Sequence, residues 1–283
     1  MLALEARGLT KRYGGVVAVD AIDLEVRKGE IVGILGPNGA GKTTALQLCL
    51  RLLHADAGEV RIFGGDPEDL EIRRRTGYAP DAPLFPKALR GLEVLRLHAD
   101  LHQVRLETIA PLVEELGLGE VVGRPCATYS KGQSQRLGLA QAMLGKPELL
   151  FLDEPTAGLD PAAVASMRQM LLRERERGTA VMLNSHLLSE VERLCDRVLF
   201  VKAGRILAAH QVGSGGRRVE VRLANPRQIG VVDGDRLRIP VASETEVPAL
   251  VARLVGQGAQ ILEVRIGGQE LEELYLQLVE GQA

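Results

Sequence analysis

Apolar and polar positions change their period several times along the first part of the chain. Residues 30–36 (EIVGILG) form a short apolar run, rich in β-branched residues and closed by glycine, which predicts a buried strand. Residues 41–53 follow with apolar positions at helical spacing and predict a helix. A strand, a glycine-rich loop and a helix in this order are typical of the start of an α/β nucleotide-binding fold.

Strand and helix patterns continue on both sides of this segment. Two strand-like runs in the first thirty residues surround a turn and predict an antiparallel pair. About 85–145 the pattern is mainly helical, and we expect a helical insertion there. From 148 to 206 strand and helix patterns alternate again, which predicts a mostly parallel sheet with helices on its faces. The last of these patterns, at 197–206, predicts a single strand.

A glycine-rich stretch divides the chain. Residues 211–216 (QVGSGG) predict a linker between two domains. After the linker, two strand-like runs, a helix near 246–256, a further strand and a final helix predict a small α+β domain at 217–283. Residues 1–210 then form one larger domain of the α/β class.

The composition is that of a globular protein and narrows the choice of partners. The 283 residues are 46% hydrophobic with a formal net charge of −2, so no overall basic charge attracts nucleic acid or an anionic membrane. Apolar runs are far shorter than the ~20 residues of a membrane span, and Glu5 and Arg7 interrupt the start of the chain too early for a signal peptide. Cys49, Cys126 and Cys195 are odd in number and scattered, which suits a reducing cytoplasm. We expect a chain that is soluble by itself and cytoplasmic, with no nucleic acid among its partners.

Residues 36–44 (GPNGAGKTT) match the P-loop pattern G-x-x-x-x-G-K-[ST]. Glycines let backbone N–H groups wrap around a phosphate, Lys42 places a charge on the β- and γ-phosphate oxygens, and the Thr43 hydroxyl can bind Mg²⁺. A plain strand-to-helix turn does not need this combination, so the sequence predicts a P-loop nucleotide site. The expected binding residues of the loop are Gly36, Pro37, Asn38, Gly39, Ala40, Gly41, Lys42, Thr43 and Thr44.

Acidic and histidine residues follow two other apolar strands. Asp153 ends the run LLFLD, at a position from which its carboxylate can bind the Mg²⁺ of a bound nucleotide. Glu154, the next residue, can act as general base for an attacking water. His186 follows another apolar run, and the carboxyl ends of parallel strands face the ligand crevice, so we expect a γ-phosphate contact. The alternatives are solvated charges at a strand end and a structural histidine.

A second helix start also has the character of an anion site. In residues 129–141 (YSKGQSQRLGLAQ), a hydroxyl and a bare glycine backbone come just before a helical pattern. Unpaired N–H groups and the positive end of the helix dipole gather at such a position. Ser130 also suits the N-cap of this helix. One chain therefore carries two phosphate-facing helix starts.

The order of these motifs over residues 1–210 resembles the ATP-binding subunit of an ABC transporter. YSKGQ at 129–133 is similar to the family signature, usually written LSGGQ, and it is followed by LLFLDEPTAGLD at 149–160 as in that family. The resemblance implies that ATP binds between two subunits in a head-to-tail dimer, where the signature of one subunit completes the site of the other. Ser130, Gly132 and Gln133 would then meet the γ-phosphate of the partner's ATP.

The resemblance assigns further residues. Tyr13 corresponds to the aromatic residue that stacks on adenine, with Val19 close by, although a half-buried strand tyrosine is the alternative. Asp160 lies in the segment that faces the dimer seam in the family. Asp81 stands where the family usually carries Gln or Glu; its shorter carboxylate could still reach Mg²⁺ or the attacking water. Lys131 replaces the second glycine of the signature and adds a cation near the partner's phosphate.

The function implied by the resemblance is that of an ATPase that powers transport. We expect a subunit of the exporter-like branch that hydrolyses ATP with Mg²⁺ and works with a separate membrane-spanning permease on the inner face of the cell membrane. Residues 128–147 are also similar to the ATPase of the copper-processing system that matures nitrous oxide reductase. The alternatives are a soluble ABC ATPase of an assembly complex and an ATP-sensing binder without turnover.

His98 and His102 stand four residues apart in a predicted helix and raise the question of a metal site. No third ligand of matching spacing is nearby, so we interpret them as two histidines on the polar face of the helix.

Overall fold

The computed structural model describes residues 1–212, 217–229, 234–241, 243–266 and 270–280. The chain divides into two compact units, Met1–His210 and Gln211–Ala283. Of the expected linker at 211–216, residues 213–216 lie outside the described residues, and Gln211 is the last residue of a strand of the first unit's sheet.

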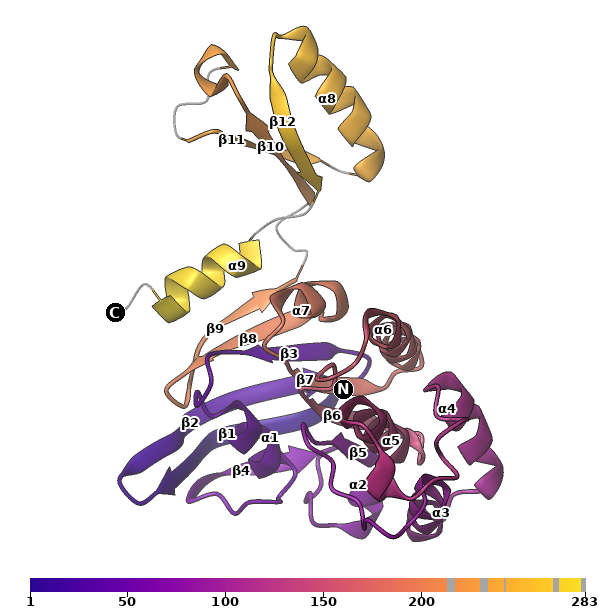
Figure 1. Ribbon diagram of the computed structural model, residues 1–283. Helices are drawn as coiled ribbons and strands as arrows, with labels where there is room; N and C mark the ends of the chain where they lie inside the picture. Colours follow the sequence, from indigo (N-terminus) through magenta and orange to yellow (C-terminus); the bar gives the residue numbers. More distant parts are fainter. Residues whose placement is uncertain (213–216, 230–233, 242, 267–269, 281–283) are drawn as a thin grey trace. The chain divides into compact units, whose positions relative to one another are not determined.

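The central sheet of the first unit has the strand order β5-β6-β7-β3-β8-β9 (Figure 1). The strands, in this order, are Thr76–Ala79, Leu149–Asp153, Ala180–Asn184, Ile31–Leu35, Arg197–Lys202 and Arg205–Gln211. Pairing is parallel from β5 through β6, β7 and β3 to β8. Every residue of β3, β6 and β7 is buried, as expected for parallel strands covered on both faces. The mostly parallel α/β fold predicted from the sequence is confirmed.

The prediction of one strand at 197–206 is wrong. Ala203 and Gly204 both have positive φ angles, 49° and 77°, and this two-residue turn separates β8 from β9. Two consecutive positive φ angles are the backbone of a tight hairpin turn. The strand β9 that follows alternates between exposed and half-buried residues and lies at the edge of the sheet.

A second, antiparallel sheet of the first unit has the order β2-β1-β4, with bounds Val16–Arg27, Leu2–Tyr13 and Ala57–Ile62. Its buried face shares one hydrophobic core with helix α1 (Lys42–Cys49) and with residues of the central sheet, so α1 is covered on both sides. The antiparallel N-terminal strands were predicted from the sequence. The structure adds β4, which the hydrophobic pattern did not reveal because only Val60 and Ile62 of its six residues are buried.

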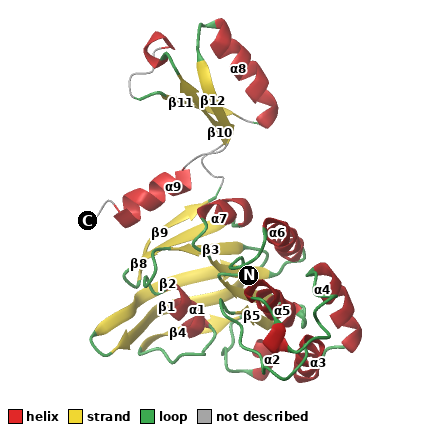
Figure 2. Cartoon of the chain, in the orientation of Figure 1, coloured by secondary structure: helices red, strands yellow, loops and turns green. Residues whose placement is uncertain are grey.

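The predicted helical stretch contains α3 (Gly91–His102), α4 (Ile109–Glu115) and α5 (Lys131–Met143), which gather on one side of the first unit (Figure 2). The short helix α2 (Leu70–Arg74) precedes β5 and had no recognisable pattern, since it has only five residues. The remaining helices of this unit are α6 (Pro161–Glu176) and α7 (Leu188–Leu194).

The second unit contains an antiparallel sheet of order β11-β10-β12, with bounds Arg236–Val241, Arg217–Leu223 and Ile261–Ile266. Helix α8 (Val247–Gly256) packs through Leu250 and Leu254 on Val219 and Val221 of the central strand. The alternate residue Glu220 is only 7% exposed and is paired with Arg236 and Arg238. Helix α9 (Glu270–Tyr275) continues into a π-helical turn at Leu276–Glu280.

Candidate active site

The phosphate loop joins β3 to α1 and leaves the start of α1 uncapped. Its N-cap residue, Gly41, has a left-handed backbone with a φ of 98°, and neither a capping side chain nor an acidic residue occupies the first turn. A Cβ on Gly41 would also lie 2.2 Å from the carbonyl oxygen of Ala18, so glycine is required by conformation and by space. The free N–H groups at this helix start are suited to bind an anion.

Lys42 lies folded back over the loop that precedes it. Its Nζ donates hydrogen bonds to the carbonyl oxygens of Gly36 and Pro37, at 2.8 and 3.0 Å. The residue is 7% exposed, and burial lowers the pKa of its ammonium group, while the charges of Glu154 and Asp153 raise it. The ammonium group therefore stands within the loop, beside the place where phosphate oxygens would lie.

Asp153 connects the loop to the central sheet. It is 2% exposed and ends β6, directly opposite Asn184 at the end of β7. Thr43 Oγ1 donates to Asp153 Oδ1 at 3.2 Å, and the amide of Asn184 donates to the same oxygen. A hydroxyl and a carboxylate side by side are the hard oxygen ligands that Mg²⁺ prefers, so the residues present fit this ion.

Glu154 follows Asp153 in a strained backbone conformation. Its φ is 50°, a left-handed value that is uncommon for a residue other than glycine and is often found at functional sites. Its backbone N–H donates to the carbonyl of Asn184 at 2.9 Å. Its carboxylate lies 2.5 Å from His186 Nδ1 and accepts a bond from the His186 backbone N–H at 3.4 Å. Of this pair, Glu154 is mostly covered, and His186 is the exposed member.

The second helix start predicted from the sequence is α5, and it begins with a capping box. Ser130 Oγ accepts from the Gln133 backbone N–H at 3.2 Å, and Gln133 Oε1 accepts from the Ser130 N–H at 2.9 Å. This reciprocal capping box confirms the prediction that Ser130 is the N-cap. A Cβ on Gly132 would lie 2.5 Å from the carbonyl oxygen of Gly158, so the start of α5 packs directly on the loop before α6.

Asp160 caps the next helix, α6, in the same way. Its carboxylate accepts from the Ala163 N–H at 2.8 Å, and Pro161 occupies the first helical position of α6. Within the described chain, the hydrogen bonds of Ser130, Gln133 and Asp160 stay at their own helix starts, and none reaches the phosphate loop.

The remaining predicted residues lie around these elements. Asp81 is half exposed, and its carboxylate lies 3.8 Å from Lys131 Nζ. Tyr13 is 49% exposed at the end of β1, with the ammonium group of Lys11 5.6 Å from its ring centre. Val19, by contrast, is 1% exposed and belongs to the hydrophobic core, so its side chain does not offer a surface beside Tyr13.

Hydrogen bonds join the phosphate loop, Asp153, Asn184, Glu154 and His186 at the carboxyl ends of β3, β6 and β7. Sequence reasoning missed Asn184. Its place at the end of an apolar run, next to a histidine already singled out, was the signal that could have found it.

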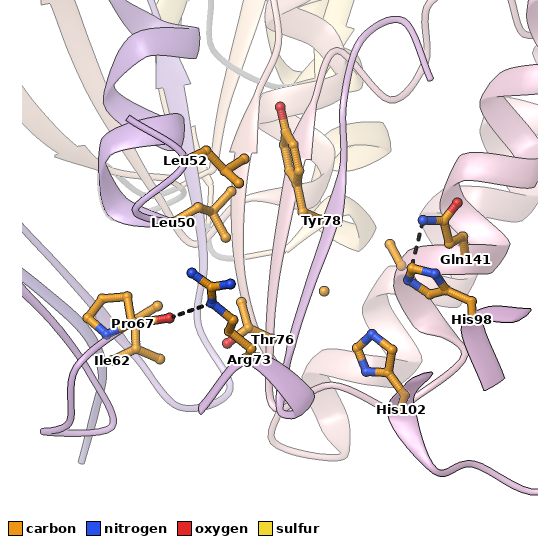
Figure 3. A pocket seen from close by; sticks show the side chains of 12 residues that line it. Leu50, Leu52, Ile62, Pro67, Arg73, Thr76, Tyr78, His98, His102 and Gln141 are labelled. Atoms are coloured by element: carbon orange, nitrogen blue, oxygen red, sulfur yellow. Dashed lines mark hydrogen bonds between the residues drawn. The ribbon is translucent and has the colours of Figure 1, made fainter. Parts of the chain in front are cut away.

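A cavity of about 290 Å³ lies elsewhere in the first unit, between the helical insertion and the sheet (Figure 3). Its lining includes Leu50, Tyr78, His98, His102 and Gln141, and none of the phosphate-loop residues. The two imidazole rings are 4.8 Å apart, and within the described residues no three potential ligands gather as a metal cluster. The histidines therefore line a cavity instead of standing on an exposed polar face as predicted.

His98 is a partly buried titratable group. Burial, with the charge of His102 as a second cause, lowers the pKa of His98 to about 4. Its Nε2 lies 3.3 Å from the side-chain amide of Gln141, as Figure 3 shows. The neutral imidazole is therefore the form that the fold favours at neutral pH.

A family model, related proteins and a solved structure all match this chain to the same family. The family model described as ABC transporter matches residues 19–157. The ABC transporter ATP-binding protein YdbJ of Bacillus subtilis is 36% identical over 96% of this chain and 94% of its own length. The daunorubicin/doxorubicin resistance ATP-binding protein DrrA of Streptomyces peucetius is 34% identical over 98% and 92% of the two chains. A solved ATP-binding subunit of an ABC transporter superposes with a TM-score of 0.70 at 26% identity, covering 89% of this chain and 99% of its own.

The pH dependence of folding stability tests the position of His98 without any ligand. Because the pKa of His98 is below its usual value of 6.5, the unfolded chain binds a proton between pH 6.5 and 4 that the folded chain does not. The free energy of unfolding should therefore fall as the pH drops through this window. For a half-exposed group we expect a loss of about 1–2 kcal/mol.

Urea denaturation at pH 7 and pH 4.5 measures this loss. His98→Gln should show the smaller pH dependence, whereas the matched change at the exposed His54 should behave like the wild type. Equal pH dependence in wild type and His98→Gln would contradict the buried neutral state.

Proposed function

The chain belongs to the ATP-binding proteins of ABC transporters, and we propose that it is the ATP-hydrolysing subunit of an exporter whose membrane-spanning permease is a separate protein. Proteins of this family hydrolyse ATP, dimerise and work with membrane permeases. The match to YdbJ and DrrA extends over nearly the whole chain, including the second unit. The drug-resistance name of DrrA supports export as the direction. No helix in the described part of the chain is long and apolar enough to cross a membrane.

One observation carries the proposal: the first unit has two helix starts suited to phosphate, and among the described residues only the start of α1 is bonded to Asp153. The start of α1 is uncapped and joined to Asp153 through Thr43. The start of α5, at the exposed Ser130, has within the described chain no hydrogen bond to the phosphate loop or to Asp153. In a two-fold dimer each subunit can offer its α5 start to the nucleotide on its partner's α1. We therefore assign Ser130, Gly132 and Gln133 to the partner's γ-phosphate and Asp160 to the dimer seam.

The hydrolysis step follows from the geometry around Glu154. Its carboxylate accepts a proton from a water molecule whose oxygen forms a bond to the γ-phosphorus. The bond from the γ-phosphorus to the oxygen that bridges it to the β-phosphate breaks, and ADP and inorganic phosphate leave. His186, 2.5 Å from the carboxylate, orients it and presents its exposed ring toward the γ-phosphate. Lys42 contributes its positive charge at the β- and γ-phosphate oxygens.

Thr43 and Asp153 are the residues that would hold Mg²⁺, which supplies positive charge to the phosphate oxygens when it is bound. Asp81 is the third candidate for this ion, and one oxygen of its carboxylate lies 3.8 Å from Lys131 Nζ. We further assign the exposed ring of Tyr13 to stacking on the adenine base. The narrower similarity to the copper-processing ATPase stays a prediction from the signature region.

Replacing the general base should separate ATP-driven closure from hydrolysis. We expect Glu154→Gln to lower the ATPase rate by about 10²–10⁴-fold, since the amide cannot accept the proton. Closure does not need this proton transfer, so the variant should accumulate as a dimer with MgATP in size-exclusion chromatography with light scattering. The double variant Lys42→Ala/Glu154→Gln, which lacks the phosphate contact, should stay monomeric. A monomer of Glu154→Gln that has bound ATP would argue against the composite site.

Purification of the tagged chain from detergent-solubilised native membranes tests the role in transport. The proposal predicts that a polytopic membrane protein without a P-loop of its own copurifies, because the permease is a separate chain. The untagged chain serves as the control for nonspecific recovery. If only soluble proteins came down with the tag, an assembly ATPase would replace the exporter subunit as the proposed function.

A further inference from the structure

One face of α5 lies along residues 80–83, the segment that comes after β5 in the sequence. Lys131 Nζ lies 3.8 Å from the carboxylate of Asp81. One turn later, Gln135 Nε2 donates to the carbonyl oxygen of Pro80 at 3.3 Å. A further turn on, a Cβ on Gly138 would lie 2.6 Å from the ring of Pro83, so this ring packs directly on the backbone of α5. Spacings of four and three residues place these positions on one side of a helix.

Gln135 also reaches the catalytic segment. The same Nε2 that bonds Pro80 donates to the carbonyl oxygen of Glu154 at 3.4 Å. Both partners are acceptors, which requires the amide nitrogen of Gln135 to face them. One buried side chain, 2% exposed, therefore connects the helix that begins at Ser130, the segment after β5 and the backbone of the general base.

Stability alone does not explain a glutamine at this position. Its Oε1 is buried, and in the described part of the chain it has no hydrogen-bond partner. A buried polar atom without a partner costs free energy, and an apolar side chain of the same length would avoid this cost while losing the two bonds of Nε2. The carbonyl oxygen of Glu154 also accepts from the Ala157 N–H at 3.0 Å, so the turn after Glu154 has a bond that does not depend on Gln135.

The backbone of Glu154 needs such an anchor. A φ of 50° persists in a non-glycine residue only when its surroundings hold it. Asn184 fixes the N–H of this residue and His186 contacts its carboxylate, while Gln135 holds its carbonyl from the side of α5. These contacts, with the bond from the Ala157 N–H, surround the backbone and carboxylate of Glu154.

We propose that Gln135 is a positioning residue for Glu154, which makes the orientation of the general base depend on the placement of α5 and of residues 80–83. The assignment rests on the proposed function, in which Glu154 is the base and the start of α5 meets the partner's nucleotide. If α5 shifts when that nucleotide binds, the side-chain amide of Gln135 moves with it and changes the position of Glu154 in the same subunit. Gln135 is assigned this role through its bond to Glu154, without a contact of its own to the reacting atoms.

The test replaces the amide by an apolar side chain of similar length. Gln135→Met should lower kcat by about 10–100-fold, because a small misplacement of a catalytic group has an effect of this size. The affinity for ATP and the thermal midpoint should stay near the wild-type values. Gln141→Met is the matched control, since this residue lies on the same helix but its amide reaches His98, and it should hydrolyse ATP at the wild-type rate.

A double-mutant cycle distinguishes positioning from a general structural effect. If Gln135 acts through Glu154, Gln135→Met should cause no further loss in a Glu154→Gln background. An additive loss in that background, or wild-type turnover of Gln135→Met, would overturn the assignment. Should Gln135→Met have a lowered thermal midpoint, Gln135→Leu provides the second apolar variant for the same cycle.

A wild-type chain that does not hydrolyse ATP would contradict the proposed function, whereas an active wild type with an unaffected Gln135→Met would contradict only this inference.

Discussion

The parallel pairing of β6 with β7 and of β7 with β3 is the constraint on which the site depends. It brings three strand ends to one edge of the sheet, so that residues from distant parts of the sequence become neighbours. Because these strands are buried on both faces, their register cannot slip without moving apolar side chains out of the core. Asp153 therefore meets Asn184 across the strands and Thr43 across the loop, inside a site that the core holds rigid.

The helical insertion reaches the catalytic segment at one point, the backbone of Glu154. Its helix α5 begins after an exposed capping serine, Ser130, and continues into the core as far as Met143. The side of α5 that faces residues 80–83 carries Lys131 and Gln135, and Gln135 also bonds the backbone of Glu154. In the proposed dimer, one end of this helix meets the partner's nucleotide while its flank contacts the catalytic turn, which would make hydrolysis depend on dimer closure.

Local motifs predicted the site better than they predicted the fold around it. The P-loop, the acidic pair after β6 and the N-cap of α5 depend on short-range spacing, and the structure shows each in the expected element. The single strand at 197–206 failed because Ala203 and Gly204 adopt a turn that apolar content does not reveal. Asn184 and Gln135 were missed because their roles depend on neighbours 31 and 19 residues away in sequence. Asp81 and Lys131 were each noticed, but their ion pair required the tertiary structure.

The central claim is that one nucleotide site is built from two subunits, and mixing two inactive variants tests it most directly. Lys42→Ala removes the phosphate contact of the P-loop. Ser130→Asp keeps the N-cap of α5 but places a negative charge against the partner's phosphate. A mixed dimer would contain one intact site, formed by the P-loop of the Ser130→Asp chain and the α5 start of the Lys42→Ala chain. The account predicts that the mixture hydrolyses ATP faster than either variant alone. Mixed dimers, verified by mass, that stay as inactive as the separate variants would contradict it.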